Sequence, residues 1–154
     1  MPRGRGERLL TLAGAASLAI AVLHLVIILI GAPAYRYFGA GEKMADLAAQ
    51  GSIYPAAVTL AIAGIFVVFG LYALAGAGRI GRLPLLRAGL VAISTIYLLR
   101  GLVAIPETAA LVLEPRERTF RYFIFSQSAL FIGVSHALGT WLAWNRLRGA
   151  RKKQ

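Results

Sequence analysis

Residues 9–30 read LLTLAGAASLAIAVLHLVIILI, a stretch that contains no Asp, Glu, Lys or Arg. About 20 apolar residues in a helix are enough to cross the hydrocarbon core of a membrane. Three arginines precede the stretch, at positions 3, 5 and 8. The stretch therefore predicts a membrane-spanning helix with a positively charged flank.

A secretory signal peptide is the alternative interpretation of this region. A basic start and an apolar core precede residues 32–34, whose Ala-Pro-Ala sequence resembles a signal cleavage site. The apolar core of a signal peptide is about 7–15 residues long, and residues 9–30 exceed that length. The length therefore favours a membrane span.

Three further apolar stretches follow, at residues 54–75, 85–105 and 120–144. The chain has 154 residues, of which 58% are hydrophobic and 15% are charged, and its mean hydropathy is +0.70. Four spans take up most of this length, so no separate soluble domain of about 50 residues fits beside them. We expect one all-α integral membrane domain over residues 1–154, a four-transmembrane-helix bundle that ends in a basic tail at residues 145–154.

The segments between the spans carry their own signals. The first loop contains helix formers after Glu42, with Met44 and Leu47 at helical spacing, and predicts a short interfacial helix over residues 42–50. Pro106 and Glu107 are expected to kink or end the third span, and residues 108–113 are expected to extend the helix if it is only kinked.

The distribution of charge predicts which ends face the cytoplasm. Eleven of the 17 Lys and Arg residues lie near the N-terminus, in or near the turn at residues 76–84, or near the C-terminus, whereas five of the six acids lie in the other two loops. Cytoplasmic loops are enriched in Lys and Arg, so both termini are expected to be cytoplasmic. The Arg-, Ala- and Gly-rich composition is typical of a bacterium, and we expect a multi-pass protein of the inner membrane.

The net charge of +11 points to lipids as partners and not to nucleic acid. A nucleic-acid-binding module needs a folded basic face with elements that stack on bases or read a groove, and the sequence has none. Basic residues next to membrane spans are attracted to anionic lipid head groups. Membrane lipids are therefore the expected partners.

Composition also limits the chemistry. The chain has no cysteine, which excludes thiol–disulfide exchange, iron–sulfur clusters and thiolate zinc sites. Two histidines and six acids leave few ligands for a metal site. There is no nucleophile elbow, H-E-x-x-H motif or Gly-rich phosphate loop, so the motifs argue against an enzyme without closing the question.

Each of the four spans places a polar side chain at a similar depth, in an outer layer of the membrane. At 1.5 Å per residue these side chains lie about 6–10 Å below the outer end of their spans. The four residues are His24, Thr59, Arg100 and Gln127. His24 shares its helical face with Ser17 and other small residues, which predicts that it points inward, while Arg100 shares a face with Glu107 and lies near Tyr97.

These residues predict an outward-facing polar pocket that binds a small anionic or polar ligand or a lipid head group. Arg100 would hold a carboxylate or phosphate, His24 would exchange a proton, and Tyr35 and Arg36 of the first outer loop would form a lid. The candidate ligand-binding residues are His24, Tyr35, Arg36, Thr59, Tyr97, Arg100, Glu107 and Gln127. The alternative is that they only hydrogen-bond helices together and that Arg100 reaches to the head groups.

Two other function classes remain open. A transporter or channel is expected to be a homo-oligomer, because four spans alone make a thin wall. Small multidrug exporters also have four spans, but residues 9–30 lack the glutamate of their first span. An accessory or assembly subunit of a larger membrane complex would dock through small residues, for which Ala57, Ala61, Gly64 and the Gly133 and Ala137 pair are candidates.

No cofactor is expected, although haem bound through a single histidine stays open. His24 and His136 differ by about 10 Å in depth along their spans, so they do not form the matched pair that a bis-histidine haem requires. We expect His136 to hydrogen-bond Ser135, Thr140 or a neighbouring carbonyl group.

Overall fold

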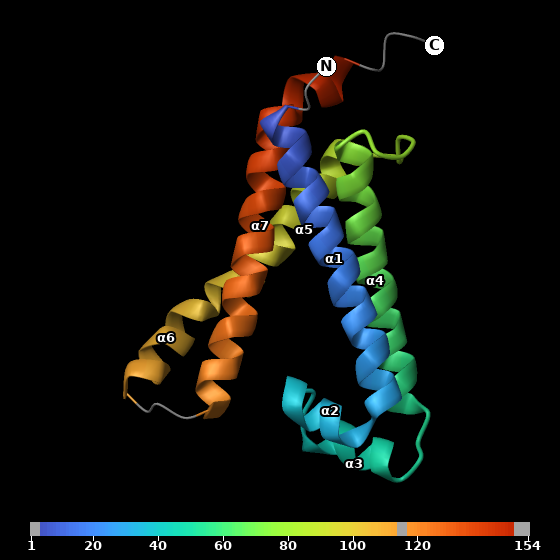
Figure 1. Cartoon of the computed structure of the whole chain (residues 1–154), viewed down its shortest axis with the longest axis vertical. Coiled ribbons are helices and arrows are strands. Elements are labelled where there is room, and N and C mark those ends of the chain that lie inside the picture. The colour runs from blue at the N-terminus through green and yellow to red at the C-terminus, as the bar shows by residue number, and fades with distance from the viewer. Residues whose placement is uncertain (1–3, 114–116, 150–154) are drawn as a thin grey trace. The chain divides into compact units, whose positions relative to one another are not determined.

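The computed structural model describes residues 4–113 and 117–149 (Figure 1). Of these residues, 86% are helical and none forms a strand. Four helical segments are long and apolar enough to cross a membrane: Arg5–Ile30, Tyr54–Gly76, Leu86–Leu113 and Phe120–Leu147. The predicted all-helical fold with four membrane spans is thereby confirmed.

The helices are α1 (Arg5–Ile30), α2 (Ala32–Phe38), α3 (Glu42–Ala49), α4 (Tyr54–Gly76), α5 (Leu86–Leu102), α6 (Ala104–Leu113) and α7 (Glu117–Gly149). Helix α1 begins before the predicted span at residues 9–30, and α7 extends beyond residues 120–144 at both ends. The reason is that Glu, Arg and Leu are good helix formers, so the helices continue beyond their apolar stretches.

The third span is made of two helices. Helix α5 ends at Leu102 and α6 runs from Ala104 to Leu113, so the span continues beyond the predicted end at residue 105. Pro106 has no N–H group to donate to the carbonyl of Leu102, and its ring crowds that carbonyl. The predicted interruption near Pro106 and the predicted continuation through residues 108–113 are both confirmed.

The first loop folds into two short helices, of which only one is predicted. Helix α3 matches the helix expected over residues 42–50, whereas α2 lies in a stretch for which the sequence predicts no helix. Gly31 (φ +78°) turns the chain after α1, and Gly39 (φ +80°) ends α2 in the left-handed conformation that glycine adopts without strain.

The described residues form two compact units. Unit 1 draws on Met1–Gly14 and Leu71–Gln154, and unit 2 is Ala15–Gly70. Helices α1 and α4 contribute residues to both units, and each unit is described by itself.

Unit 1 is built on a close contact between α5 and α7. A Cβ atom at Gly101 would lie 2.6 Å from the Cα of Leu130, and one at Gly133 would lie 2.9 Å from the backbone nitrogen of Leu98. Such small residues let the backbones of two membrane helices approach each other. Gly133, a candidate for an external docking stripe, is therefore internal.

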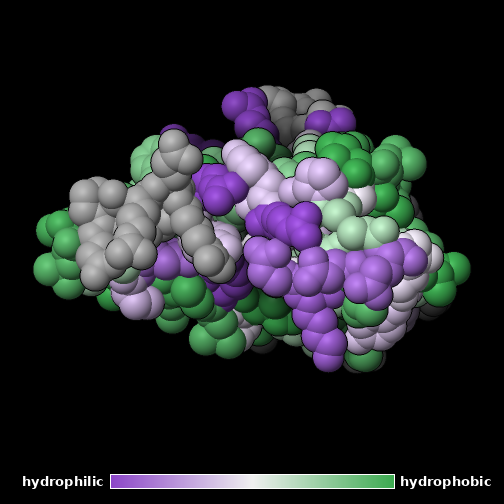
Figure 2. All heavy atoms as spheres, turned by 90° about the horizontal axis from the view of Figure 1, so that it is seen from below, coloured by the Kyte–Doolittle hydropathy of each residue, from purple (hydrophilic) through white to green (hydrophobic). Residues whose placement is uncertain are grey.

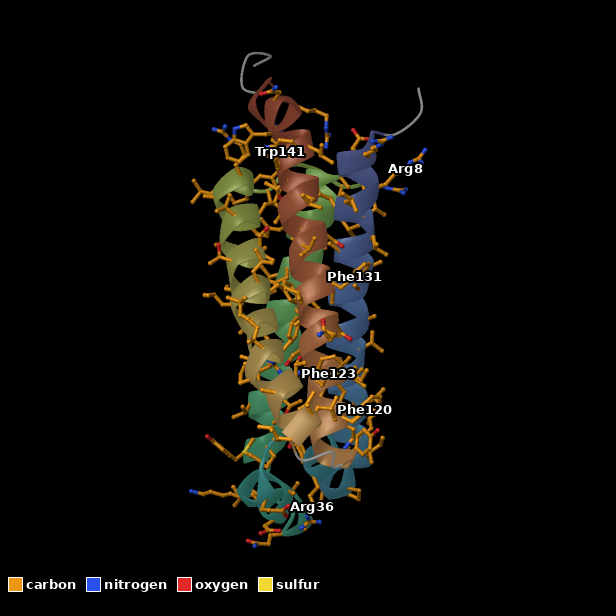
Figure 3. The ribbon with its side chains drawn as sticks, turned by 90° about the vertical axis from the view of Figure 1, so that its left-hand side faces the viewer. Arg8, Arg36, Phe120, Phe123, Phe131 and Trp141 are labelled. Atoms are coloured by element: carbon orange, nitrogen blue, oxygen red, sulfur yellow. The ribbon has the colours of Figure 1, made fainter. Side chains whose placement is uncertain are left out.

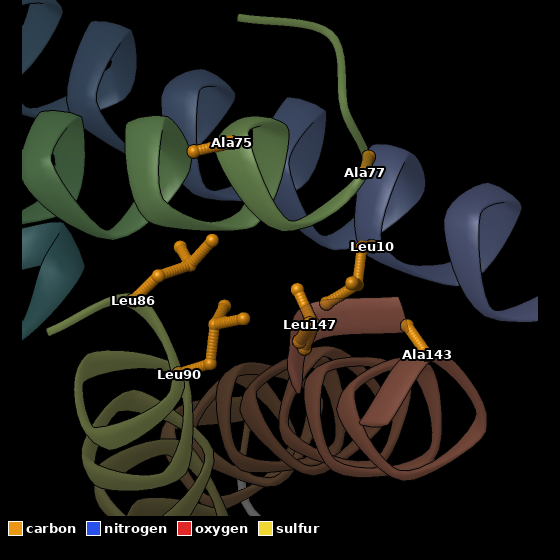
Figure 4. Packing of buried hydrophobic residues seen from close by; sticks show 7 residues of the cluster. All are labelled: Leu10, Ala75, Ala77, Leu86, Leu90, Ala143 and Leu147. Carbon is orange, nitrogen blue, oxygen red and sulfur yellow. The ribbon is translucent and has the colours of Figure 1, made fainter. Parts of the chain in front are cut away.

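At one end of unit 1, four helix ends share a hydrophobic cluster (Figure 4). Leu10 of α1 and Leu90 of α5 are completely buried there. The cluster consists of Leu10, Ala75, Ala77, Leu86, Leu90, Ala143 and Leu147. The start of α1, the end of α4, the start of α5 and the end of α7 thus lie together.

Arginine side chains bind the helix ends around this cluster. Arg82 donates a 2.7 Å hydrogen bond to the carbonyl of Leu147, and Arg146 donates one to the carbonyl of Gly76. Arg146 also forms an ion pair with Glu7, with 3.2 Å between Nε and Oε1. The last carbonyls of α4 and α7 carry partial negative charge, so these arginines complement them. We call this the arginine end of unit 1, defined by Arg79, Arg82, Arg87 and Arg146.

In unit 2, α1 and α4 pack side by side, and α2 and α3 lie at the end where the first loop joins them (Figure 1). Ile27 of α1 is buried with Ala34, Tyr35 and Ala45 of the two short helices. This small core fixes α2 and α3 against the end of α1.

Candidate functional site

Arg100 is held between α5 and α7 by a hydroxyl group. Its Nη1 donates a 2.6 Å hydrogen bond to the Oγ of Ser126, and Ser126 is completely buried. The rest of the Arg100 side chain is exposed. Among the described residues no carboxylate forms an ion pair with Arg100, and Ser126, its hydrogen-bond partner there, is neutral.

Arg100 reaches Ser126 because the next residue, Gly101, lies against Leu130. That contact brings the backbones of α5 and α7 close together beside Arg100. From Leu86 to Arg100 the helix rises by about 21 Å, and from Phe120 to Ser126 by about 9 Å. The guanidinium group therefore lies inside the span, in the half remote from the arginine end.

Glu107 does not pair with Arg100 among the described residues. Its Oε2 atom is buried without a hydrogen-bond partner there. The two residues were predicted to share a face because seven residues are nearly two turns of one helix. The break at Val103 between α5 and α6 interrupts that periodicity, so the shared face of Arg100 and Glu107 stays a prediction.

Tyr97 lies in the contact between α5 and α7, where its ring stacks on that of His136. The ring centroids are 5.5 Å apart, the interplanar angle is 20°, and the side chains are 3% and 0% exposed. Neither ring nitrogen of His136 has a hydrogen-bond partner among the described residues, and Ser135 instead donates to the carbonyl of Phe131. The predicted hydrogen bond of His136 is therefore wrong.

The stacked pair escaped the sequence analysis because the residues lie on different helices. Periodicity shows which side of a helix a residue occupies but not which residue of another helix it meets. Gly133 was the available signal in the sequence, since a glycine in an apolar span favours a helix contact, and the structure places it against Tyr97 and Leu98. Gln127, the remaining predicted site residue of unit 1, is half-buried next to Ser126.

In unit 2, His24 is half-buried and packs on Phe66 of α4, with 5.1 Å between ring centroids. Its Nδ1 lies 2.8 Å from the carbonyl oxygen of Ile20. Because a carbonyl oxygen can only accept, Nδ1 carries the proton, and Nε2 is the atom of the neutral ring that accepts a hydrogen bond.

Two predicted site residues meet in unit 2. Thr59 of α4 donates a 3.3 Å hydrogen bond to the hydroxyl of Tyr35 on α2. The two side chains are 6% and 3% exposed. This bond fastens the first loop to α4, so Tyr35 is a structural part of the loop.

Arg36 is committed to carboxylates of its own loop. Its Nε lies 2.9 Å from Glu42 and its Nη2 lies 2.7 Å from Asp46, both on α3. These hydrogen bonds, with Glu42 the stronger influence, raise the pKa of Arg36 above its usual value. The hydrophilic surface of α2 and α3 is seen face-on in Figure 2. Arg36 therefore joins α2 to α3 in the loop that was predicted to be a lid.

The predicted site residues thus separate into two sets. Arg100, Tyr97, Glu107 and Gln127 belong to unit 1, and His24, Tyr35, Arg36 and Thr59 belong to unit 2. Within the described ranges, no three His, Asp or Glu side chains gather as metal ligands would. Haem bound through a single histidine stays a prediction.

Compared with known protein families, curated proteins and solved structures, the chain matches none. Its function must therefore be inferred from its own structure. The hydrogen bond of Arg100 with Ser126 is the most informative feature for that inference.

Proposed function

We propose that the protein binds a small anionic or polar ligand, or a lipid head group, through Arg100. The supporting observation is the 2.6 Å hydrogen bond that fixes one arm of the guanidinium group to Ser126 and leaves its charge without a described carboxylate partner. A guanidinium group presents several N–H donors in one plane and can bind a carboxylate or phosphate through two of them.

The energetic argument concerns the cost of a charge inside a membrane. An arginine near the centre of a span costs about 2.5–3.5 kcal/mol on insertion scales. A serine hydroxyl satisfies one donor but does not neutralise the charge. An anion bound to Arg100 would offset this cost, whereas an arginine that reaches to the head groups would need no ligand.

We also propose that the membrane is a bacterial inner membrane and that both termini are cytoplasmic. The start of α1, the turn after α4 and the end of α7 lie at the arginine end, which gathers basic residues from the turn after α4, the start of α5 and the end of α7. Such an end is expected on the cytoplasmic side. Arg100 would then lie in the outer half of the membrane.

Native mass spectrometry of the protein released from a neutral detergent tests ligand binding at Arg100. The wild type should retain an adduct that Arg100→Ala loses and that Arg100→Lys retains only weakly, because lysine keeps the charge but not the planar fork. Arg8→Ala is the matched control, since Arg8 is exposed at the start of α1. Identical spectra for wild type and Arg100→Ala would contradict the proposal.

A second candidate function is that of an accessory subunit that docks through α4. Ala57, Ala61 and Gly64 are exposed, and a Cβ atom at Gly64 would meet nothing within 4 Å. Small exposed residues at this spacing suit close approach of another membrane helix. On a native gel of solubilised membranes, the wild type should then migrate with a larger complex and Ala61→Leu should not. A transporter or channel should instead migrate as a homo-oligomer.

A further inference from the structure

A continuous groove runs along the surface of unit 1 from the arginine end. It consists of three adjoining depressions of about 300, 560 and 520 Å³. Arg87 lines the first and the second, and Val91 and Trp144 line the second and the third. The shared residues show that the depressions are parts of one groove between α5 and the end of α7.

The mouth of the groove is positively charged. Arg82 and Arg87 line the first depression. The guanidinium carbon of Arg87 lies 4.9 Å from the centre of the Trp144 ring, a cation–π contact that holds the side chain at the groove. Arg82 is anchored by its hydrogen bond to Leu147, and among the described residues neither arginine pairs with a carboxylate.

The rest of the groove is mainly apolar, and its length along α5 equals the thickness of about one membrane leaflet. Val91, Leu98 and Ala137 line the third depression with Trp141 and Trp144. From Arg87 to Leu98 the helix rises by about 16 Å, and half of the hydrocarbon core is about 15 Å thick. A molecule with a charged head at the arginines and an acyl chain along α5 matches both parts.

We propose that this groove binds an anionic phospholipid from the leaflet at the arginine end. Arg82 and Arg87 contact the phosphate, and the acyl chain lies along Val91 against Trp144. Basic pockets between membrane helices recognise anionic head groups, and tryptophan suits the boundary between head group and chain. An apolar helix of another protein would leave the two arginine charges unmatched, so charge complementarity favours the phospholipid.

This site differs from the one proposed at Arg100. Arg87 and Arg100 are separated by about 20 Å of helical rise along α5. The loss of binding at one site can therefore be distinguished from loss at the other.

Quenching of tryptophan fluorescence by brominated lipid tests the proposal. The chain has two tryptophans, so Trp141→Phe leaves Trp144 as the single reporter in the groove. The variant is reconstituted in phosphatidylcholine vesicles that contain increasing fractions of phosphatidylglycerol with dibrominated acyl chains. Phosphatidylglycerol should reach half-maximal quenching at a lower fraction than equally brominated phosphatidylcholine, by roughly fivefold for each contacting arginine.

Two further variants locate the binding site. The double variant Arg82→Gln, Arg87→Gln should lose the preference for the anionic lipid. The control double variant Arg5→Gln, Arg8→Gln removes the same amount of charge from the start of α1 and should keep that preference. Ala92→Phe keeps both arginines but fills the groove, and should reduce quenching by both lipids at low fractions. Circular dichroism and elution volume check that each variant is folded.

Three results would overturn the proposal. The first is equal quenching by the two brominated lipids in the Trp141→Phe protein. The second is an unchanged preference in the variant without Arg82 and Arg87. The third is loss of the preference when excess inorganic phosphate is added, because that would show a site for a free anion and not for a phospholipid.

Discussion

Gly101 occupies a position on α5 where a side chain would collide with another helix. A Cβ atom there would lie 2.6 Å from the Cα of Leu130, a backbone atom that cannot move aside without moving α7. The same contact brings Arg100 to Ser126. A single hydrogen atom in place of a side chain thus determines both the packing of two spans and the position of the charged group.

Replacing Gly101 with Ala should therefore destabilise unit 1. We expect a loss of about 1–3 kcal/mol in the free energy of unfolding, the usual cost of overpacking. Gly64→Ala is the matched control, because a Cβ atom there meets nothing within 4 Å and alanine favours a helix. Unfolding of both variants in mixed micelles measures the difference, and equal stabilities would refute the close contact.

The charged residues inside the spans could be found from the sequence, but their partners could not. Arg100 is conspicuous because residues 9–30, 54–75, 88–105 and 122–144 contain no other Asp, Glu, Lys or Arg, and its depth follows from counting residues. Its contact with Ser126 and the stacking of Tyr97 on His136 depend on how two helices are rotated and shifted against each other. Helical periodicity does not contain that information.

At the scale of whole helices, the third span is a single apolar stretch of sequence that forms two consecutive helices. Helix α5 ends at Leu102, α6 begins at Ala104, and Pro106 lies in the first turn of α6. Because a proline residue can be identified from sequence, the interruption was predictable. The continuation through residues 108–113 could be predicted only on the condition that the proline kinks the span and does not end it, since proline both begins helices and ends them.

Pro106→Ala should allow α5 and α6 to become one helix. Alanine supplies the N–H group that can bond the carbonyl of Leu102, and its helix propensity is about 3 kcal/mol more favourable in a helix interior. The amides of residues 103–105 should then exchange hydrogen more slowly than in the wild type. Unchanged exchange at these residues would show that packing, and not the proline, interrupts the span.

Arg146 joins the ends of three helices. It donates to the carbonyl of Gly76 on α4 and pairs with Glu7 of α1, while its own backbone belongs to α7. Arg146→Gln should lower the free energy of unfolding by about 1–2 kcal/mol, since a hydrogen bond to a charged group and part of an ion pair are lost. Arg8→Gln, at an exposed position of α1, should leave stability nearly unchanged in the same unfolding measurement.

At the scale of the whole molecule, composition was sufficient to predict an all-helical protein with four spans. Each span exceeds the minimum length for crossing a membrane, and the described helices contain all four predicted stretches almost completely. Helix α2 of the first loop was not predicted, because Tyr35 and Tyr37 have no strong helix signal. Its stability comes from packing of Ala34 and Tyr35 in the core of unit 2.

The proposed orientation can be tested on the whole chain because it contains no native cysteine. Lys43→Cys on α3 should react in intact cells with a thiol reagent that cannot cross the membrane. Arg79→Cys, at the arginine end, should react only after the cells are permeabilised. Trp141, which projects from α7 near the end that carries Arg8, is expected at the same membrane surface as Arg79 (Figure 3). Labelling in the reverse pattern would invert the proposed topology.

The meeting of α1 with α7 at the hydrophobic cluster has a consequence for biosynthesis. Leu10 is completely buried among residues that include Ala143 and Leu147, so its α7 partners are made more than 130 residues after it. Until those residues leave the ribosome, the start of α1 cannot reach its final contacts. Unit 1 therefore closes after translation of its last helix, and a chain that stops before α7 leaves Leu10 without its α7 partners.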